Sequence, residues 1–114
     1  MIRRGEVYWV NLDPVIGSEA DKTRPGLVIS NDINNENAAT VTVLALSTQL
    51  KRVYPFEVLL KKDVTGLPED SKAMAHQIRT VDKRRLMGQP LGSTLSDELM
   101  SRIESALKLH LQLS

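Results

Sequence analysis

The chain has 114 residues, 41% of them hydrophobic and 25% charged, which is the size and composition of one ordinary globular domain spanning residues 1–114. It contains no cysteine, which excludes disulfides and thiolate zinc sites and fits a cytoplasmic protein. The formal net charge is only +1, so the chain lacks the basic excess of a non-specific nucleic-acid binder. No signal peptide is apparent, and no apolar run is long enough to span a membrane.

The first half of the chain predicts three strands separated by polar turns. Each strand segment is rich in β-branched or aromatic residues and is followed by turn-forming residues. These segments are residues 6–12, 26–30 and 40–46. The last of them ends in a near-continuous apolar run, which indicates burial on both faces. Before it, the asparagine-rich residues 31–37 predict a turn with room for one helical turn.

The second half of the chain predicts two further strands, over residues 56–60 and 73–78. A loop that contains glycine and proline separates them. Residues 82–86 predict a short helical turn, and residues 88–92 are broken by glycine and proline. All five prolines are therefore expected outside the strand interiors.

After this break the hydrophobic period changes to that of a helix. The apolar positions are Leu95, Leu99, Ile103, Ala106, Leu107 and Leu111. Ser96 is a good N-cap residue, and Asp97 and Glu98 follow it in the first turn, where the helix dipole favours acids. We expect one amphipathic helix from Asp97 to about Gln112. Short strands followed by a helix predict a mainly β (α+β) domain, a small β-barrel with this helix packed on it.

Several kinds of catalytic site have no support in the sequence. The phosphate-binding glycine loops, the HExxH zinc motif and the GxSxG nucleophile motif are absent. A carboxylate metal site would need a chance assembly of Glu19, Asp21 and other acids. A nuclease with two catalytic histidines would need His76 and His110 in one site. We expect His110 on the surface near the end of the helix, whereas His76, in a predicted strand, is either a packing residue or a site residue.

After these exclusions, an arginine and a threonine hydroxyl remain as candidate catalytic groups, each at the end of a predicted strand. Pro25 keeps Arg24 extended where it enters the second strand. The guanidinium can then meet an anion with a fixed fork of donors, or pair with Glu19 or Asp21. Thr48 follows the third strand and is either a turn residue or a site residue. If the two strands are neighbours, Arg24 and Thr48 could flank one phosphate.

Such a pair could cleave RNA without a metal or another cofactor. RNA carries its own nucleophile, the 2′-OH, so an enzyme needs only to align this oxygen with the phosphorus and stabilise the charge that develops. Arginine suits the second task because its fork matches two phosphate oxygens. Ser47 and Gln49 would add polar side chains beside Thr48.

Several segments together resemble the MazF/PemK family of toxins from type II toxin–antitoxin pairs. They occur in the family's order and, with the leucine-rich C-terminal helix, cover essentially the whole chain. The segments are Arg4-Gly5-Glu6-Val7-Tyr8-Trp9, Gly17-Ser18-Glu19, Arg24-Pro25-Gly26-Leu27-Val28-Ile29-Ser30, Ser47-Thr48, Tyr54-Pro55-Phe56-Glu57-Val58 and Gln77-Ile78-Arg79-Thr80.

The resemblance implies an SH3-like barrel of about five to seven strands that forms a homodimer. It implies a sequence-specific, ribosome-independent and metal-independent endoribonuclease acting on single-stranded RNA, chiefly mRNA. Such enzymes leave a 2′,3′-cyclic phosphate and a 5′-OH, and they inhibit translation and growth. The resemblance also implies a MazE-like antitoxin, whose acidic, partly disordered tail would block the RNA groove. No cofactor and no membrane association are implied.

The resemblance assigns catalysis to Arg24 and Thr48. We further expect an RNA-binding, base-recognition surface made of Glu19, Ser47, Gln49, His76 and Gln77. Two departures from the family pattern stand out. Ala20, Asp21 and Lys22 replace a glutamine followed by small residues, and His76 replaces an acidic residue common in relatives.

Two other functions are compatible with this kind of fold. One is a toxin of the same fold that binds and poisons DNA gyrase without cutting RNA, and Arg24 with Thr48 argues against it. The other is a non-catalytic SH3-like interaction domain. Its aromatic-lined groove would be hard to build from only four aromatic residues.

Overall fold

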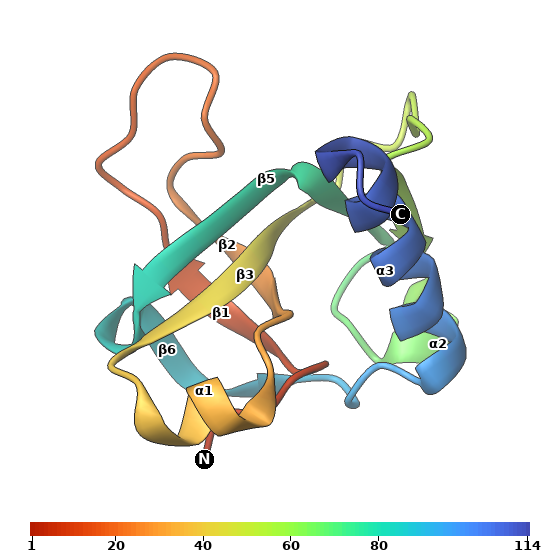
Figure 1. Ribbon diagram of the computed structural model, residues 1–114. Helices are drawn as coiled ribbons and strands as arrows, with labels where there is room; N and C mark the ends of the chain where they lie inside the picture. Colours follow the sequence, from red (N-terminus) through yellow and green to blue (C-terminus); the bar gives the residue numbers. More distant parts are fainter.

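The computed structural model describes residues 1–114 and contains one six-stranded antiparallel sheet (Figure 1). The strands are β1 (Val7–Asn11), β2 (Thr23–Val28), β3 (Thr40–Ser47), β4 (Glu57–Leu60), β5 (Ser71–Asp82) and β6 (Leu86–Leu91). The helices are α1 (Asp32–Asn37), α2 (Lys62–Thr65), α3 (Asp97–Leu111) and the short 3₁₀ helix η1 (Lys83–Arg85). None of them is long and apolar enough to cross a membrane.

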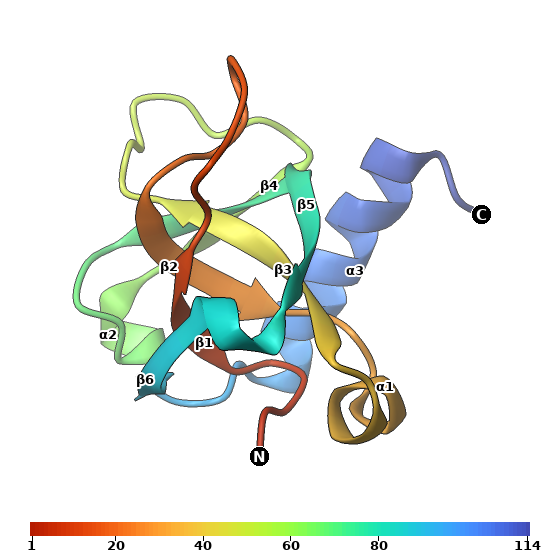
Figure 2. The same ribbon diagram turned by 90° about the vertical axis from the view of Figure 1, so that its left-hand side faces the viewer.

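The sheet has the order β4-β5-β3-β2-β1-β6 and curves strongly, as Figures 1 and 2 show. Its edge strands β4 and β6 are not paired with each other, so the sheet stays open where a full barrel would close. The predicted mainly β class and the C-terminal helix are confirmed, and the six strands fall within the five to seven that the resemblance implied, although β6 was not among the predicted segments. The strands β2 and β3 are neighbours in the sheet, which is the condition under which Arg24 and Thr48 could lie close together.

Strand β5 bends sharply where its pairing with β3 changes register. Leu44 pairs with Ile78, but Leu46 already pairs with Ala73, so residues 74–77 of β5 stand against the single residue 45 of β3. A surplus of residues on one strand breaks the ladder and bends that strand. The bend contains His76 and Gln77, and it therefore decides where these two side chains lie.

Two apolar clusters lie on opposite faces of the sheet. Strand β3 contributes Leu44 and Leu46 to the cluster beneath α3, and Val41 and Val43 to the other cluster. All four side chains are at most 1% exposed, which confirms the predicted burial of this strand on both faces. A strand buried on both faces is a rigid mount for the residues that follow it.

Helix α3 begins and packs as the sequence pattern predicts. The Ser96 side chain accepts a hydrogen bond from the Leu99 N–H, which satisfies one free donor of the first turn. Met100, Ile103 and Ala106 are buried, and the helix packs on β4 and β5. Its last turn therefore lies near the bend of β5.

The structure differs from the sequence prediction in two strands and one helix. Pro25 lies inside β2 and Pro90 inside β6, so the prediction that all prolines avoid strand interiors is wrong. Both sites tolerate proline because β2 pairs with β3 only from Gly26 onward, and because β6 is an edge strand. The predicted loop before β5 contains the single-turn helix α2, which Gly66 ends in the left-handed conformation.

Candidate active site

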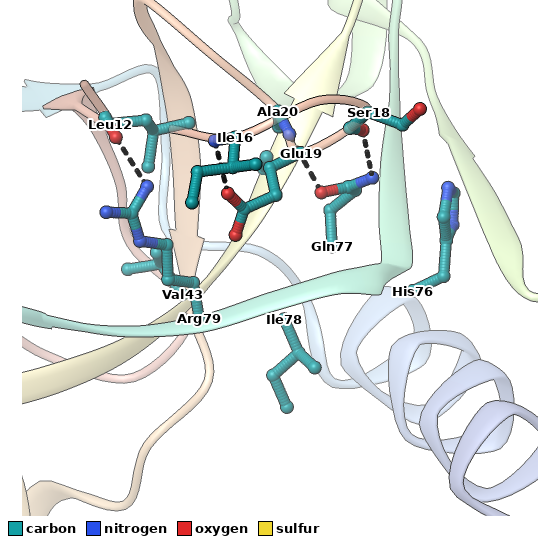
Figure 3. A pocket seen from close by; sticks show the side chains of 11 residues that line it. Leu12, Ile16, Ser18, Glu19, Ala20, Val43, His76, Gln77, Ile78 and Arg79 are labelled. Carbon is teal, nitrogen blue, oxygen red and sulfur yellow. Dashed lines mark hydrogen bonds between the residues drawn. The ribbon is translucent and has the colours of Figure 1, made fainter. Parts of the chain in front are cut away.

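A cavity of about 430 Å³ lies between the β1–β2 loop and the bend of β5 (Figure 3). The loop lines it with Ile16, Ser18, Glu19 and Ala20, and β5 lines it with His76, Gln77, Ile78 and Arg79; Leu12, Val43 and Ala45 complete the lining. Three of the predicted base-recognition residues, Glu19, His76 and Gln77, thus meet in one cavity. The other two, Ser47 and Gln49, do not line it.

Gln77 connects β5 to the tip of the β1–β2 loop. Its Oε1 accepts a hydrogen bond of 2.9 Å from the Ala20 N–H, and its Nε2 donates to the Ser18 carbonyl at 3.4 Å (Figure 3). Within the loop, the Glu19 carboxylate accepts from the Ile16 N–H at 2.5 Å. These bonds give a polar loop a defined position over the cavity.

Two arginines hold the base of the same loop. The Arg79 guanidinium donates to the Leu12 carbonyl, and Arg85 Nη1 donates to the carbonyls of Asn11 and Asp13 at 3.0 and 2.6 Å. Sequence reasoning gave neither arginine this role, because the partners are backbone atoms of a distant strand end. Their positive charges are thus already engaged with the chain's own carbonyl oxygens.

Arg24 lies in β2 opposite Val10 of β1, extended as predicted. Its Nε donates to the Asp21 carbonyl at 2.9 Å, and its Nη2 forms an ion pair of 3.1 Å with the Asp21 carboxylate. Of the two acids that the sequence offered as partners, Arg24 therefore contacts Asp21 and not Glu19. The Arg24 hydrogen bond is the main cause that lowers the pKa of Asp21 below its ordinary value.

Ser47 ends β3, and Thr48 and Gln49 follow it on the surface. The Ser47 hydroxyl oxygen accepts a hydrogen bond from the Gln49 N–H at 3.1 Å, which shapes a turn. Gly26 pairs with Ala45 in an antiparallel ladder, so the start of β2 lies beside the end of β3. Arg24 and Thr48 thus lie at the same end of neighbouring strands, although neither lines the cavity and no hydrogen bond joins them.

His76 belongs to an aromatic cluster with Phe56 and His110. Its ring centroid lies 4.8 Å from that of Phe56, edge to face, and 6.3 Å from that of His110. His110 is exposed in the last turn of α3, as expected, but the structure brings the two histidines together, which the sequence did not predict. Burial lowers the pKa of His76, and repulsion from His110 and Lys72 adds to this against the attraction of Glu57.

A buried ion pair between Lys72 and Glu57 lies beside this aromatic cluster. Lys72 Nζ lies 3.0 Å from Glu57 Oε1, with side chains only 9% and 2% exposed. The same ammonium donates to the Arg52 carbonyl at 2.7 Å, and the same carboxylate accepts from the Tyr54 N–H at 2.9 Å. The pair therefore fixes the segment that leads into Phe56. Charged residues in short strands are usually exposed, so the sequence carried no signal of this burial.

Known proteins match the chain over its whole length. A family model described as "PemK-like, MazF-like toxin of type II toxin-antitoxin system" matches residues 3–111. The chain is 45% identical to Endoribonuclease MazF9 of Mycobacterium tuberculosis, over 99% of this chain and 98% of that protein. It is 39% identical to Endoribonuclease EndoA of Bacillus subtilis, over 99% of this chain and 97% of that protein. A solved mycobacterial endoribonuclease in complex with its cognate antitoxin has a TM-score of 0.80 and 28% identity, over 100% of this chain and 98% of that one.

Proposed function

The chain belongs to the family of PemK-like, MazF-like toxins of type II toxin–antitoxin systems, and from this premise we propose that it is a sequence-specific, ribosome-independent endoribonuclease of single-stranded mRNA. The full-length similarity to two proteins named endoribonucleases supports the activity. The observation that carries the choice of residues is the position of Arg24 and Thr48 at the same end of two neighbouring strands. Cleavage of mRNA would inhibit translation and growth.

The proposed reaction is a transesterification that needs no metal and no cofactor. The 2′-oxygen of the ribose attacks the adjacent phosphorus, and the bond between phosphorus and the 5′-oxygen breaks. The products are a 2′,3′-cyclic phosphate and a 5′-OH, with the 2′ proton lost and one proton gained by the leaving oxygen. Alignment of the two oxygens and stabilisation of the extra negative charge are the two tasks of the protein.

In this proposal Arg24 stabilises the charge that develops on the phosphoryl oxygens. The guanidinium of an arginine does not lose its proton in proteins, so an electrostatic role suits this residue type better than that of a free general base. Thr48 would donate a hydrogen bond from its exposed hydroxyl to the scissile phosphate. Arg24 lies near the start of β2 and Thr48 directly follows β3, and pairing of these two strands limits the movement of both positions.

Base recognition is proposed for Glu19, Ser47, Gln49, His76 and Gln77. Glu19, His76 and Gln77 line the cavity under the β1–β2 loop. Ser47 and Gln49 lie at the end of β3 and in the turn that follows it. Their carboxylate, amide, hydroxyl and imidazole groups provide both donors and acceptors for the edges of unstacked bases.

We propose two protein partners and a cytoplasmic setting. The first partner is a second copy of the chain, in a homodimer. The second is a MazE-like antitoxin whose acidic tail would compete with RNA. The solved mycobacterial relative in complex with its cognate antitoxin supports the second partner.

The test is incubation of the purified protein with a long, unstructured RNA in excess EDTA, followed by mapping and chemical identification of the new ends. We expect cuts at one short sequence, with cyclic phosphate on one side and 5′-OH on the other. Intact RNA, from protein shown to be folded and free of antitoxin, would overturn the proposal. An assay of gyrase supercoiling on the same sample would then test the alternative of a gyrase poison.

A further inference from the structure

The two edges of the Arg24 guanidinium are in different situations. The edge formed by Nε and Nη2 is bound by Asp21 alone, through the backbone carbonyl at 2.9 Å and the carboxylate at 3.1 Å. The opposite edge, formed by the two terminal nitrogens Nη1 and Nη2, makes no further hydrogen bond to the protein. A guanidinium can bind two oxygens of an anion along either edge. Asp21 therefore restricts which edge is available.

The position of Asp21 is itself fixed by its two neighbours in the chain. The N–H of Ala20 donates to Gln77 Oε1 on β5 at 2.9 Å. On the other side, the N–H of Lys22 donates to the Asp13 carboxylate at 2.9 Å, and the Lys22 carbonyl accepts from the Leu12 N–H at 2.9 Å. Asp21 is thus held between two anchored residues, unlike the members of a typical surface ion pair.

The backbone at Lys22 adds a second restriction. Its φ of +64° lies in the left-handed region, which a side-chain-bearing residue adopts only when its surroundings enforce it. This turn folds the chain back so that both the carbonyl and the carboxylate of Asp21 reach the same guanidinium. A carbonyl of the main chain cannot leave Arg24 when a phosphate arrives unless the loop itself moves.

From these contacts we propose that Asp21 is a positioning residue, which holds the Nε edge of Arg24 and thereby presents the Nη1/Nη2 edge to the scissile phosphate. This inference rests on the proposed function, since it specifies how Arg24 would meet RNA. Asp21 would not touch the substrate. It would act by fixing the direction of the donors on Arg24, and the rate of the chemical step is sensitive to that direction.

The alternative is that Asp21 competes with the phosphate for Arg24, and the two roles predict opposite kinetics. If Asp21 positions Arg24, the Asp21→Ala variant cleaves more slowly at saturating RNA, with kcat lower by about ten- to a hundredfold. KM stays similar or falls slightly, because one negative charge near the RNA is gone. If Asp21 competes, the same variant has an unchanged kcat and a lower KM.

Three further variants separate positioning from a general effect of charge or folding. Asp21→Asn keeps a side-chain oxygen as acceptor, so we expect it to restore kcat to within about threefold of the unmodified protein. Asp63→Ala removes the same charge from α2, far along the chain from the loop, and should leave both constants unchanged. In an Arg24→Ala background, Asp21→Ala should have no additional effect.

The experiment measures kcat and KM of these variants on one oligoribonucleotide that contains the mapped cleavage site, together with the NMR signals of the Arg24 Nη2 and Nε protons. We expect the Nη2 protons to exchange slowly with water in the unmodified protein and quickly in Asp21→Ala, which removes the carboxylate that accepts from Nη2. The Nε–H donates to the main-chain carbonyl of residue 21, which the substitution keeps, and serves as an internal control. A kcat that survives in Asp21→Ala, or an equal loss in the Arg24→Ala background, would overturn the proposal. If the unmodified protein cuts no RNA, the proposed function fails, and Nη2 signals unchanged by Asp21→Ala would separately refute the contact of Arg24 with the Asp21 carboxylate.

Discussion

The imidazole rings of His76 and His110 lie 6.3 Å apart, centroid to centroid, and the ring of Phe56 lies against both. One histidine belongs to the bend of β5 and the other to the last turn of α3. His76 also lines the cavity under the β1–β2 loop. The end of the C-terminal helix is thereby connected to the candidate site through two imidazole side chains.

This arrangement predicts how stability depends on pH. The pKa of His76 in the folded chain is lowered from 6.5, first by burial and then by His110 and Lys72, while Glu57 acts in the opposite direction. As the pH falls, His76 is therefore protonated near pH 6.5 in the unfolded chain but only at lower pH in the folded chain. The contribution of His76 to the free energy of unfolding is full above about pH 6.5 and is lost as the pH falls from there towards the folded pKa.

Urea unfolding at about pH 7.5, 6.5 and 5.5 measures this loss, and His76→Gln should make the free energy of unfolding less dependent on pH in that window. The aspartates with lowered pKa titrate at more acidic pH and do not interfere. His110→Gln is the matched control, since it removes one source of repulsion and should reduce the dependence only in part. An unchanged pH profile in His76→Gln would contradict the prediction.

Replacing Arg24 should abolish cleavage while the fold survives. Arg24→Ala removes the proposed stabilisation of the developing charge, and we expect activity to fall by about a hundredfold or more. The cost to stability should be small, because the ion pair with Asp21 is partly exposed, at 31% and 42% for the two side chains. Arg24→Lys keeps the charge but not the fork, so it should recover only a minor part of the activity. Full activity in Arg24→Ala would refute its assignment.

The role of Thr48 has its own set of substitutions. Thr48→Val keeps the shape of the side chain but removes the hydroxyl, and Thr48→Ser keeps the hydroxyl. We expect the first to lose most of the cleavage rate and the second to retain it, because only the hydroxyl would contact the phosphate. Thr48 is exposed, so thermal unfolding should be nearly the same in all three proteins. Equal rates for the two variants would refute a catalytic hydroxyl.

Removing the Gln77 amide should loosen the β1–β2 loop. In Gln77→Ala the Ala20 N–H loses its acceptor, and its hydrogen exchange should accelerate about fivefold, which corresponds to a bond of about 1 kcal/mol. The N–H of Lys22 is an internal control, because its acceptor is Asp13 and it should exchange as before. Gln77→Glu retains an oxygen acceptor, so the Ala20 N–H should stay protected from hydrogen exchange in this variant. Unchanged exchange at Ala20 in Gln77→Ala would show that the loop is held by other contacts.

Local patterns account for the parts of this structure that the sequence predicted. Helix α3 was predictable because its apolar period and its Ser96 cap both lie within one short stretch of sequence. Strand β3 was predictable because its β-branched and apolar residues are continuous. The contact between Arg24 and Asp21 was among the possibilities, since the partners are three residues apart. Each of these depends only on neighbours in the chain.

The parts that could not be predicted depend on pairing between distant segments. Strand β6 contains Gly88 and Pro90, which break a local strand pattern, and it exists because it pairs with β1. The bend that places His76 and Gln77 follows from the register of β5 against β3. No property of either strand alone fixes that register. The approach of His110 then requires that α3 pack on the same end of β5.

The buried pair of Glu57 and Lys72 gives the strongest prediction about stability. Their charged atoms lie 3.0 Å apart, and Lys72→Met would leave the Glu57 carboxylate buried without its counter-charge. Breaking a buried pair by removing one partner costs about 3–5 kcal/mol, which urea unfolding can measure. Combining Lys72→Met with Glu57→Gln should cost less than the single change, because glutamine carries no charge and can still accept from the Tyr54 N–H.

The matched control is Lys61→Met, which removes an ion pair with Asp70 at the surface. There the charged atoms lie 3.7 Å apart and the side chains are 57% and 35% exposed, so the cost should stay below about 1 kcal/mol. Lys72 also holds the Arg52 carbonyl, so its loss should free the segment leading to Phe56 and disturb the contact of that ring with His76. If Lys72→Met costs no more than Lys61→Met, the pair does not stabilise the fold, and the cluster beside the cavity must be held by apolar packing alone.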